Sequence, residues 1–200
     1  MDEFDESKFV RSMMYEQNVP KWRQYASIVI GNPTIGRLIA YELRVALLGS
    51  VQGAVGLFLR QKFYRKMFRK VGRNVVIGRD VVIRHGDNIS LGDNVVLDDG
   101  CLLDGRGAGE EGVVVGNNSI IGRRATVQSK VGFLRIGANV NIGTDTSVTS
   151  QGGLEIGDWA QIAGGCKISG GRLSWNPTCR TESRSGACRP ARSSSANAAS

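Results

Sequence analysis

Aliphatic residues recur at every sixth position through the middle of the chain. They form five triplets with that spacing, and gaps of 8, 12, 9 and 8 residues separate one triplet from the next. An α-helix with about 3.6 residues per turn would carry such positions around its axis, so the spacing excludes an amphipathic helix. A triangular coil keeps it, because six residues supply one short strand and one corner, and three such units close a coil of about 18 residues. The triplets are Val71, Ile77 and Ile83; Leu91, Leu97 and Leu103; Val115, Ile121 and Val127; Ile136, Ile142 and Val148; and Ile156, Ile162 and Ile168.

The other positions of the six-residue repeat carry a pattern of their own. Glycine follows the aliphatic residue in eight repeats, which predicts a backbone with unusual dihedral angles at that position. Small or β-branched residues stand four positions after the aliphatic one, where they predict a second set of inward-facing columns. Asn and Asp fill positions between, as suits exposed corners. The sequence therefore predicts a parallel β-helix over residues 71–171. The small residues are Val75, Val81, Val95, Cys101, Ser119, Ala125, Val140, Thr146, Ala160 and Cys166.

This repeat, [LIV]-G-x-x-[STAV]-x, resembles that of the hexapeptide-repeat family over residues 71–170. The resemblance implies a left-handed parallel β-helix, against the general preference for right-handed crossovers. Most members of that family are acyltransferases, typically homotrimers with active sites between subunits. The resemblance therefore implies an O-acetyltransferase that takes acetyl-CoA as co-substrate and acts on a sugar or polysaccharide precursor. Because one scaffold hosts several chemistries, a catalytically silent trimeric β-helix scaffold is the alternative.

The resemblance also implies a histidine as general base, since an acceptor hydroxyl must lose its proton as it attacks the thioester. The chain has one histidine, His85, with Asp87 two residues further on. We expect His85 to be the base and Asp87 to orient it, and the alternative is a surface imidazole. Residues 166–175, where many similar sugar O-acetyltransferases carry the base, contain no histidine. One imidazole also excludes the three-histidine metal site of the family's carbonic anhydrases, and no metal is predicted.

Extra residues enter the repeat only after the third aliphatic residue of a coil. They are residues 84–90, 104–114, 128–135 and 149–155. Because each insertion occupies the same position within its coil, all four are predicted to emerge at one corner of the prism. Protruding loops there can build a pocket that a β-helix otherwise lacks. Segment 104–114 is the longest, and we expect it to reach over a neighbour. The residues that bind acetyl-CoA stay unassigned.

Residues 1–70 are predicted to form a helical extension before the repeat domain. One helix runs through residues 35–48, and a second runs from residue 54 to about residue 70. The second helix has one apolar face flanked by basic side chains. That face is assigned to Leu59, Phe63 and Met67, with Tyr64 and Phe68 beside it.

Two interpretations of this basic, amphipathic second helix stay open. It caps the first coil, whose strand edges would otherwise be exposed. Alternatively, residues 57–70 lie on an anionic membrane surface, as in a peripheral membrane adaptor. The longest uncharged run, residues 45–59, has 15 residues, fewer than the roughly 20 that span a bilayer.

Charge is unevenly distributed along the chain, whose formal net charge is +8. Residues 57–84 hold nine basic side chains and one acidic one, whereas residues 85–171 hold six basic and ten acidic. A mildly acidic repeat domain, poor in aromatic residues, argues against a nucleic-acid partner. The acidic start without a signal sequence, and four cysteines without a disulfide or zinc pattern, indicate a cytoplasmic protein.

The repeat pattern stops at the beginning of residues 172–200. This segment is rich in Arg, Ser and Ala and nearly free of large apolar side chains, which predicts a disordered, low-complexity tail. One hypothesis is a basic tail that docks on an acidic partner. The other is a change of reading frame near residue 172, which would have removed further coils together with a late histidine.

Overall fold

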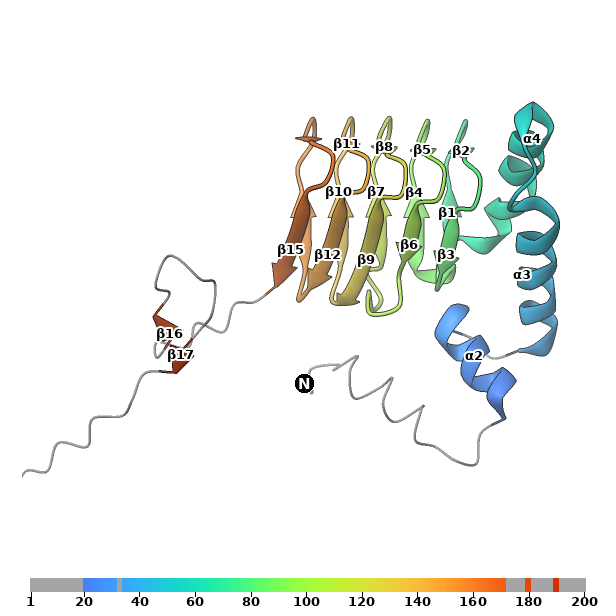
Figure 1. The fold of residues 1–200 in the computed structure, drawn as a ribbon, viewed down its shortest axis with the longest axis horizontal. Helices are drawn as coiled ribbons and strands as arrows, with labels where there is room; N and C mark the ends of the chain where they lie inside the picture. Colours follow the sequence, from blue (N-terminus) through green and yellow to red (C-terminus); the bar gives the residue numbers. More distant parts are fainter. Residues whose placement is uncertain (1–19, 32–33, 172–178, 181–188, 191–200) are drawn as a thin grey trace, which may run out of the picture.

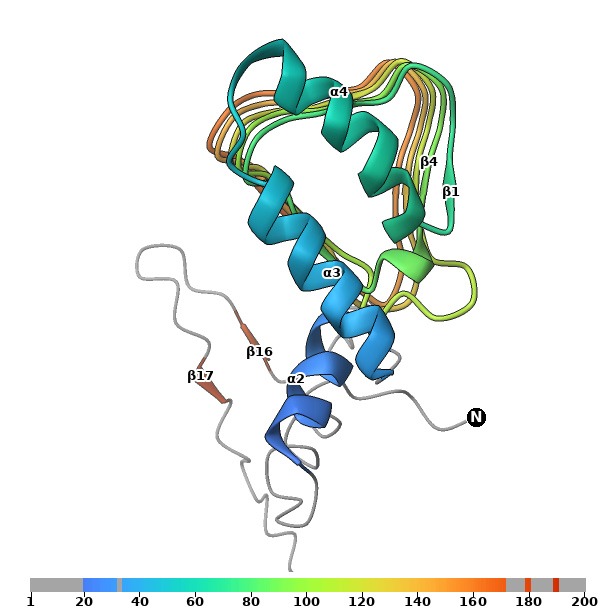
Figure 2. The ribbon, with the colours of Figure 1, turned by 90° about the vertical axis from the view of Figure 1, so that its right-hand side faces the viewer.

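The chain winds as a parallel β-helix of about five coils, preceded by helices (Figure 1). The computed structural model describes residues 20–31, 34–171, 179–180 and 189–190. Three five-stranded parallel sheets form the flat sides of a triangular prism. Figure 2, viewed along the prism, shows the triangular outline and the left-handed course of the coils. The predicted fold class is confirmed, including its handedness.

Each coil contributes one strand to each sheet. The helices are α2 (Lys21–Val29), α3 (Ile35–Leu48) and α4 (Gly53–Phe63), followed by the 3-10 helix η1 (Tyr64–Met67). The first sheet contains β1 (Lys70–Val71), β4 (Ile89–Leu91), β7 (Val113–Val115), β10 (Leu134–Ile136) and β13 (Leu154–Ile156). The second contains β2 (Val76–Ile77), β5 (Val96–Leu97), β8 (Ile120–Ile121), β11 (Asn141–Ile142) and β14 (Gln161–Ile162). The third contains β3 (Val82–Arg84), β6 (Leu102–Asp104), β9 (Thr126–Val131), β12 (Ser147–Gln151) and β15 (Lys167–Gly171).

Two short strands follow the prism, β16 (Cys179–Arg180) and β17 (Arg189–Pro190), which pair antiparallel. The rest of residues 172–200 lies outside the described residues. The predictions of a disordered tail and of a reading-frame change fall there.

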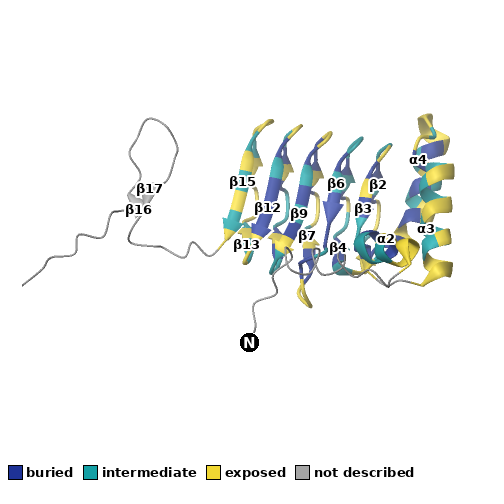
Figure 3. Ribbon diagram, turned by 60° about the horizontal axis from the view of Figure 1, so that its bottom comes forward, coloured by how far each residue is buried: buried dark blue, intermediate teal, exposed yellow. Residues whose placement is uncertain are grey.

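The aliphatic ladder sets the register of all three sheets. In the second sheet Ile77 pairs with Leu97, Leu97 with Ile121, and Ile121 with Ile142. The other two aliphatic columns align in the same way. These side chains are buried in the inner coils, and so are the small residues of the second predicted column. The core is thus a stack of aliphatic layers inside the prism (Figure 3).

The glycine after each aliphatic residue has a role different from the predicted one. None of these glycines has a positive φ; the left-handed residue stands two positions later and is usually Asn or Asp, such as Asn94 (φ 56°) and Asp145 (φ 58°). At Gly78, an added Cβ would lie 2.7 Å from the backbone of the next coil at Asp98 and Asp99. Glycine is therefore required because neighbouring coils approach closely, and the prediction of unusual dihedral angles at this position is wrong.

The second predicted helix lies across the open end of the first coil (Figure 2). Its α-helical part ends at Phe63, and η1 continues it to Met67, short of residue 70. The predicted face is also wrong in part, because Phe63 is exposed and the residues turned to the prism include Gly56 and Arg60, then Tyr64 and Met67. The capping interpretation nevertheless matches the structure, since Tyr64 and Met67 belong to the core of the prism.

Arg60 explains why the prism-facing side of α4 is not simply apolar. The side chain is only 3% exposed. Its Nε donates to the carbonyl of Ile77 at 3.0 Å, and its Nη1 donates to those of Leu48 and Val51 at 3.1 and 2.6 Å. One guanidinium group therefore satisfies carbonyls from the end of α3, from the α3–α4 connection and from the first coil.

Candidate functional site

All four insertions emerge where the third sheet turns into the first, as predicted. They connect β3 to β4, β6 to β7, β9 to β10, and β12 to β13. The first contains the 3-10 helix η2 (Gly86–Asn88), whereas the last two lengthen β9 and β12 beyond the prism body. We call this corner the insertion edge. It is the part of the prism where the repeat is interrupted and where side chains of irregular type gather.

Arg69, just before β1, ties the longest insertion to the first one. Its Nε donates to the carbonyl of Asp87 at 2.7 Å, its Nη1 to that of Glu110 at 2.8 Å, and its Nη2 to Oδ1 of Asn88 at 3.3 Å. Among the described residues, no carboxylate lies within ion-pair distance of Arg69. Arg69 thus brings a positive charge to the insertion edge while holding two loops together.

Segment 104–114 folds back over the next coil of its own chain. The backbone N–H of Gly107 donates to the carbonyl of Ser129 at 2.9 Å, and a side chain at position 107 would overlap the carbonyl of Lys130. At the loop tip, Glu111 pairs with Arg135 at 2.6 Å. The expected reach over a neighbour is thus met within one chain, by an adjacent coil.

A hollow of about 530 Å³ opens between these loops. Arg106, one of its lining residues, pairs with Asp104 at 2.9 Å, and both side chains are largely buried. Guanidinium and amide donors, one glutamate and several glycines surround the space. We call it the edge hollow; its lining residues are Arg69, Asn88, Arg106, Gly107, Gly109, Glu110 and Gly132.

His85 does not point into the edge hollow but packs under the C-terminal end of α2. Its backbone N–H donates to the carbonyl of Val29 at 2.9 Å, and its Nε2 lies 2.9 Å from the carbonyl oxygen of Ser27 and 3.2 Å from that of Ile28. Because carbonyls only accept, Nε2 carries the proton and Nδ1 holds the free lone pair. Nδ1 faces Gly31, where a side chain would overlap the ring.

Burial determines how the imidazole titrates. The His85 side chain is 9% exposed, and desolvation lowers its pKa below 6.5, while the nearby charge of Asp104 acts in the opposite direction. The ring is therefore neutral in the folded protein near pH 7. A neutral imidazole with one free lone pair has the protonation state of a general base, although the enclosing α2 segment restricts access to it.

Asp87 is directed away from His85. Its two carboxylate oxygens accept hydrogen bonds from Nη2 of Arg37 in α3 at 2.9 and 2.7 Å. No hydrogen bond joins Asp87 to His85 among the contacts of the described residues. The left-handed backbone of His85 (φ 49°) and the η2 turn send the two side chains to different helices. The structure thus does not assemble the pair as a dyad, and catalytic roles for His85 and Asp87 stay predictions.

The Arg37–Asp87 pair borders a smaller hollow of about 200 Å³ between α2, α3 and the first coil. Tyr41, which donates to the carbonyl of Ile83 at 3.0 Å, also lines it. Burial raises the pKa of Tyr41 to about 12. Arg44 and Lys66 lie on the lining of this hollow as well. The phenol and the Arg37–Asp87 ion pair connect the helices to the first coil.

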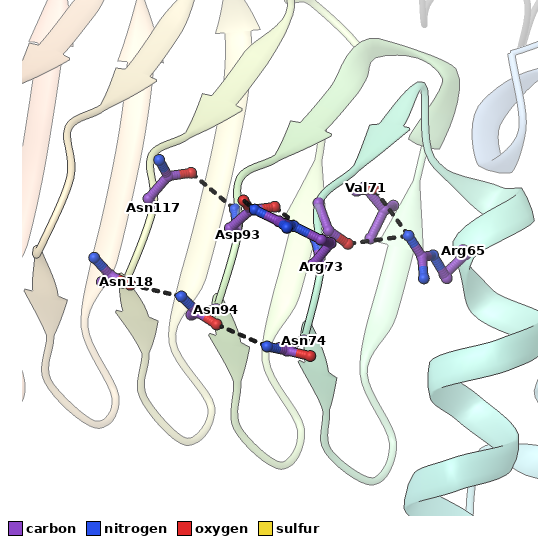
Figure 4. Close-up of polar contacts among 9 residues, drawn as sticks. Arg65, Val71, Arg73, Asn74, Asp93, Asn94, Asn117 and Asn118 are labelled. Carbon is purple, nitrogen blue, oxygen red and sulfur yellow. Dashed lines mark hydrogen bonds and ion pairs between the residues drawn. The ribbon is translucent and has the colours of Figure 1, made fainter.

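The corner between the first and second sheets carries a ladder of asparagines (Figure 4). Side-chain amides link Asn74 to Asn94 at 3.2 Å, Asn94 to Asn118 at 2.9 Å, and Asn118 to Asn139 at 3.2 Å. Beside the ladder, Asp93 accepts from the backbone N–H of Arg73 at 2.6 Å, and this bond lowers the pKa of the carboxyl group. A polar hollow of about 450 Å³ borders this corner. Its asparagine amides bond to one another, and its Asp93 carboxylate accepts from Arg73, so this corner mainly stabilises the coil stack.

Sequence reasoning missed the residues that shape the insertion edge, Arg69 and Arg106. Both lie outside the six-residue pattern, so periodicity carries no signal for them.

In the part of the chain that the structure describes, no group of three or more His, Cys, Asp or Glu side chains could hold a metal ion. No helix there combines the length and apolar character needed to cross a membrane. Cys101 and Cys166 are free, and burial raises the pKa of the Cys101 thiol to about 12.

Comparison of the chain with protein-family models, with curated proteins and with solved structures returns no match. The functional assignment therefore rests on the β-helix and on the chemistry of its insertion edge.

Proposed function

We propose that this chain is an acyltransferase subunit of the hexapeptide-repeat type, which moves an acetyl group from acetyl-CoA to a hydroxyl group of a sugar or polysaccharide precursor. The observation that carries this proposal is the edge hollow. It is formed by loops that interrupt an otherwise regular prism, and its volume of about 530 Å³ suits a small ligand.

The residues around the edge hollow suit an acceptor with several hydroxyl groups. Arg69 and the side-chain amide of Asn88 can donate to its oxygen atoms, and the carboxylate of Glu110 can accept from its hydroxyl groups. Gly107 and Gly132 also line the space, so part of its wall is backbone. Holding the acceptor beside the thioester supplies a large part of the acceleration of such a reaction.

The transfer itself needs a proton acceptor. The acceptor oxygen bonds to the thioester carbon, the carbon–sulfur bond breaks, and the hydroxyl proton passes through a base to the departing sulfur. His85 is the one imidazole in the sequence, and its Nδ1 is the atom that would take the proton. Because Gly31 covers Nδ1 and the ring does not face the edge hollow, this role requires the end of α2 to move away and the imidazole to turn toward the hollow.

The enclosed position of His85 favours a second candidate function, a catalytically silent scaffold. In that case the imidazole holds α2 on the prism, and the insertions serve only the stacking of the coils. The two candidates differ in whether acetyl-CoA is turned over.

The deciding experiment follows thiol release from acetyl-CoA in the presence of a panel of sugars. A transferase releases CoA only with an acceptor, and Arg69→Gln lowers the rate at least about tenfold because a charged hydrogen-bond donor is lost. Arg124→Gln is the matched control, since Arg124 is an exposed arginine paired with Asp145 at another corner. No thiol release from a folded, assembled protein favours the scaffold instead.

His85→Asn separates the base from a positioning residue. Loss of turnover with an unchanged melting temperature supports a role as base. Parallel loss of turnover and of thermal stability assigns His85 to the attachment of α2.

We further propose that the subunits form a homotrimer through the flat faces of the prism, as the resemblance implies. Val82 on the third sheet and Ile120 on the second are exposed apolar side chains on those faces. Sedimentation that detects only a monomer would contradict this assembly.

The use of acetyl-CoA fits the cytoplasmic location indicated by the sequence.

A further inference from the structure

A row of large aliphatic side chains runs along the outer side of α3. Ile35, Ile39, Leu43 and Leu47 stand four residues apart and are 53–61% exposed. The side of α3 that packs on the prism carries the partly buried Tyr41, Val45 and Leu48, so the row lies on another side of the helix. Side chains at this spacing share one face of a helix and form a continuous apolar strip.

The outer side of α4 extends this strip. The prism-facing side of α4 contains Gly56 and Arg60, and Val55 and Phe58 point the other way, with 68% and 67% of their surface exposed. Because α3 and α4 contact each other, their exposed sides form one layer at the end of the prism (Figures 2 and 3). We call these six side chains the apolar helix face: Ile35, Ile39, Leu43, Leu47, Val55 and Phe58. An exposed apolar patch of this kind marks an interaction surface.

Basic side chains adjoin the apolar helix face. Lys62 follows Phe58 by one turn of α4, and Arg65 and Lys66 follow in η1; all three are exposed. Arg65 also donates to the carbonyls of Val71 and Gly72 in the first coil, so Lys62 and Lys66 are the side chains of this group without such a bond to the described residues of the prism. Residues 57–70 contain six basic side chains and no acidic one. Arg60 among them is buried and Arg69 binds the insertion loops, so the exposed charge here comes from the other four, Lys62, Arg65, Lys66 and Lys70.

Helix α2 lies at the same end of the molecule (Figure 2) and carries two partly exposed aromatic residues, Trp22 and Tyr25, of which Tyr25 donates to Glu42 of α3. Apolar side chains bordered by Lys and Arg, with Trp and Tyr nearby, characterise helices that lie in a membrane interface.

We infer that the apolar helix face is a docking surface for an anionic lipid bilayer, with α3 and α4 lying in the plane of the interface. The charge of the adjoining segment selects this partner over a second copy of the chain, because two copies joined here would bring two strongly basic segments together. In the membrane interpretation of the sequence, residues 57–70 make this contact. Here most of the apolar contact is assigned to α3, and residues 57–70 supply mainly the basic side chains. This inference is independent of the proposed transferase activity.

Co-sedimentation of the full chain with lipid vesicles tests the inference. The chain should bind vesicles that contain phosphatidylserine more tightly than vesicles of phosphatidylcholine alone, and the difference should shrink from about 0.1 M to about 1 M salt. The double variant Ile39→Gln, Leu43→Gln should lower the partition coefficient at least about tenfold on both kinds of vesicle. Lys62→Gln should lower it about fivefold, and only on the anionic vesicles.

Trp159→Asn is the matched control. Trp159 is 73% exposed in the last described coil, at the opposite end of the prism, and its left-handed backbone (φ 63°) accommodates Asn. Its replacement should leave vesicle binding unchanged, and circular dichroism should show that every variant is folded. Failure of the full chain to bind anionic vesicles overturns the inference, as does binding that the double variant retains. A photo-crosslinker at Leu43 that captures a second copy or residues 1–19 in place of lipid also overturns it.

Discussion

Replacing Arg60 with Met tests how the helical layer is fastened to the prism. The guanidinium group is buried and donates to the carbonyls of Leu48, Val51 and Ile77. Methionine replaces the aliphatic stem of the arginine with an unbranched apolar chain, but it lacks the guanidinium group and leaves all three carbonyls without this donor. We therefore expect Arg60→Met to destabilise the fold even though it places an apolar side chain in a buried position.

The magnitude follows from the three bonds and from the cost of burying the charge. A hydrogen bond from a charged donor contributes about 1.5–3 kcal/mol, so three would contribute about 4.5–9 kcal/mol if they were additive. Removing the buried charge returns several kcal/mol of desolvation free energy, which leaves a net loss of about 2–4 kcal/mol.

Urea denaturation, followed by circular dichroism and by tryptophan fluorescence, measures this loss. Lys62→Met is the control, because it removes a positive charge two residues away on the exposed side of α4 and should change the free energy of unfolding by less than about 0.5 kcal/mol. If Arg60→Met is as stable as the control, the three hydrogen bonds do not fasten the helical layer, and the reasoning is refuted.

Three further predictions concern the coils and the residues beside them. Gly78→Ala should lower the free energy of unfolding by about 2 kcal/mol or more, because its Cβ would meet the next coil, whereas Gly157→Ala, with open space around it, should be nearly neutral in the same urea titration. Tyr64→Phe should raise the melting temperature, since the buried hydroxyl has no hydrogen-bond partner in the described structure and its removal relieves about 1 kcal/mol. Burial lowers the pKa of His85 from 6.5, so the unfolded chain binds the proton more readily, and stability should be complete above about pH 6.5 and decrease as the pH falls further. His85→Asn should flatten this dependence between about pH 5 and pH 7, and an unchanged slope in urea midpoints would contradict the assignment.

The coils of the β-helix and their register could be predicted because the information for them is local and repeated, whereas the handedness came from the family resemblance. The spacing from Val71 to Ile168 states which side chains share a column, and the structure pairs the members of each column directly. The corner at which the insertions emerge could also be predicted, because each insertion follows the third aliphatic residue of its coil. The role of glycine could not, because a sequence shows that a position must be small without showing whether space or dihedral angle is the reason.

Contacts between elements distant in the sequence explain the other errors. The apolar pattern of α4 predicted Phe63 as a core residue. The side of α4 that carries Arg60 faces the prism instead, because Arg60 donates to carbonyls at the end of α3 and in the first coil. His85 and Asp87 are near in sequence, yet α2 and α3 each bind one of them. Arg69 joins two insertions and carries no periodic signal at all.

The uniform register of the sheets makes the prism a modular object whose length can change in steps. Because Leu91 and Val115 occupy equivalent places, excising residues 91–114 would connect Ser90 to Val115 and leave every remaining column continuous. Each coil added or removed in this way shifts everything beyond it by one strand spacing, about 4.8 Å. Duplication of a gene segment that encodes one coil can thus increase the distance between the far end of the molecule and its helical layer by one strand spacing, without a change in the sequence of any coil.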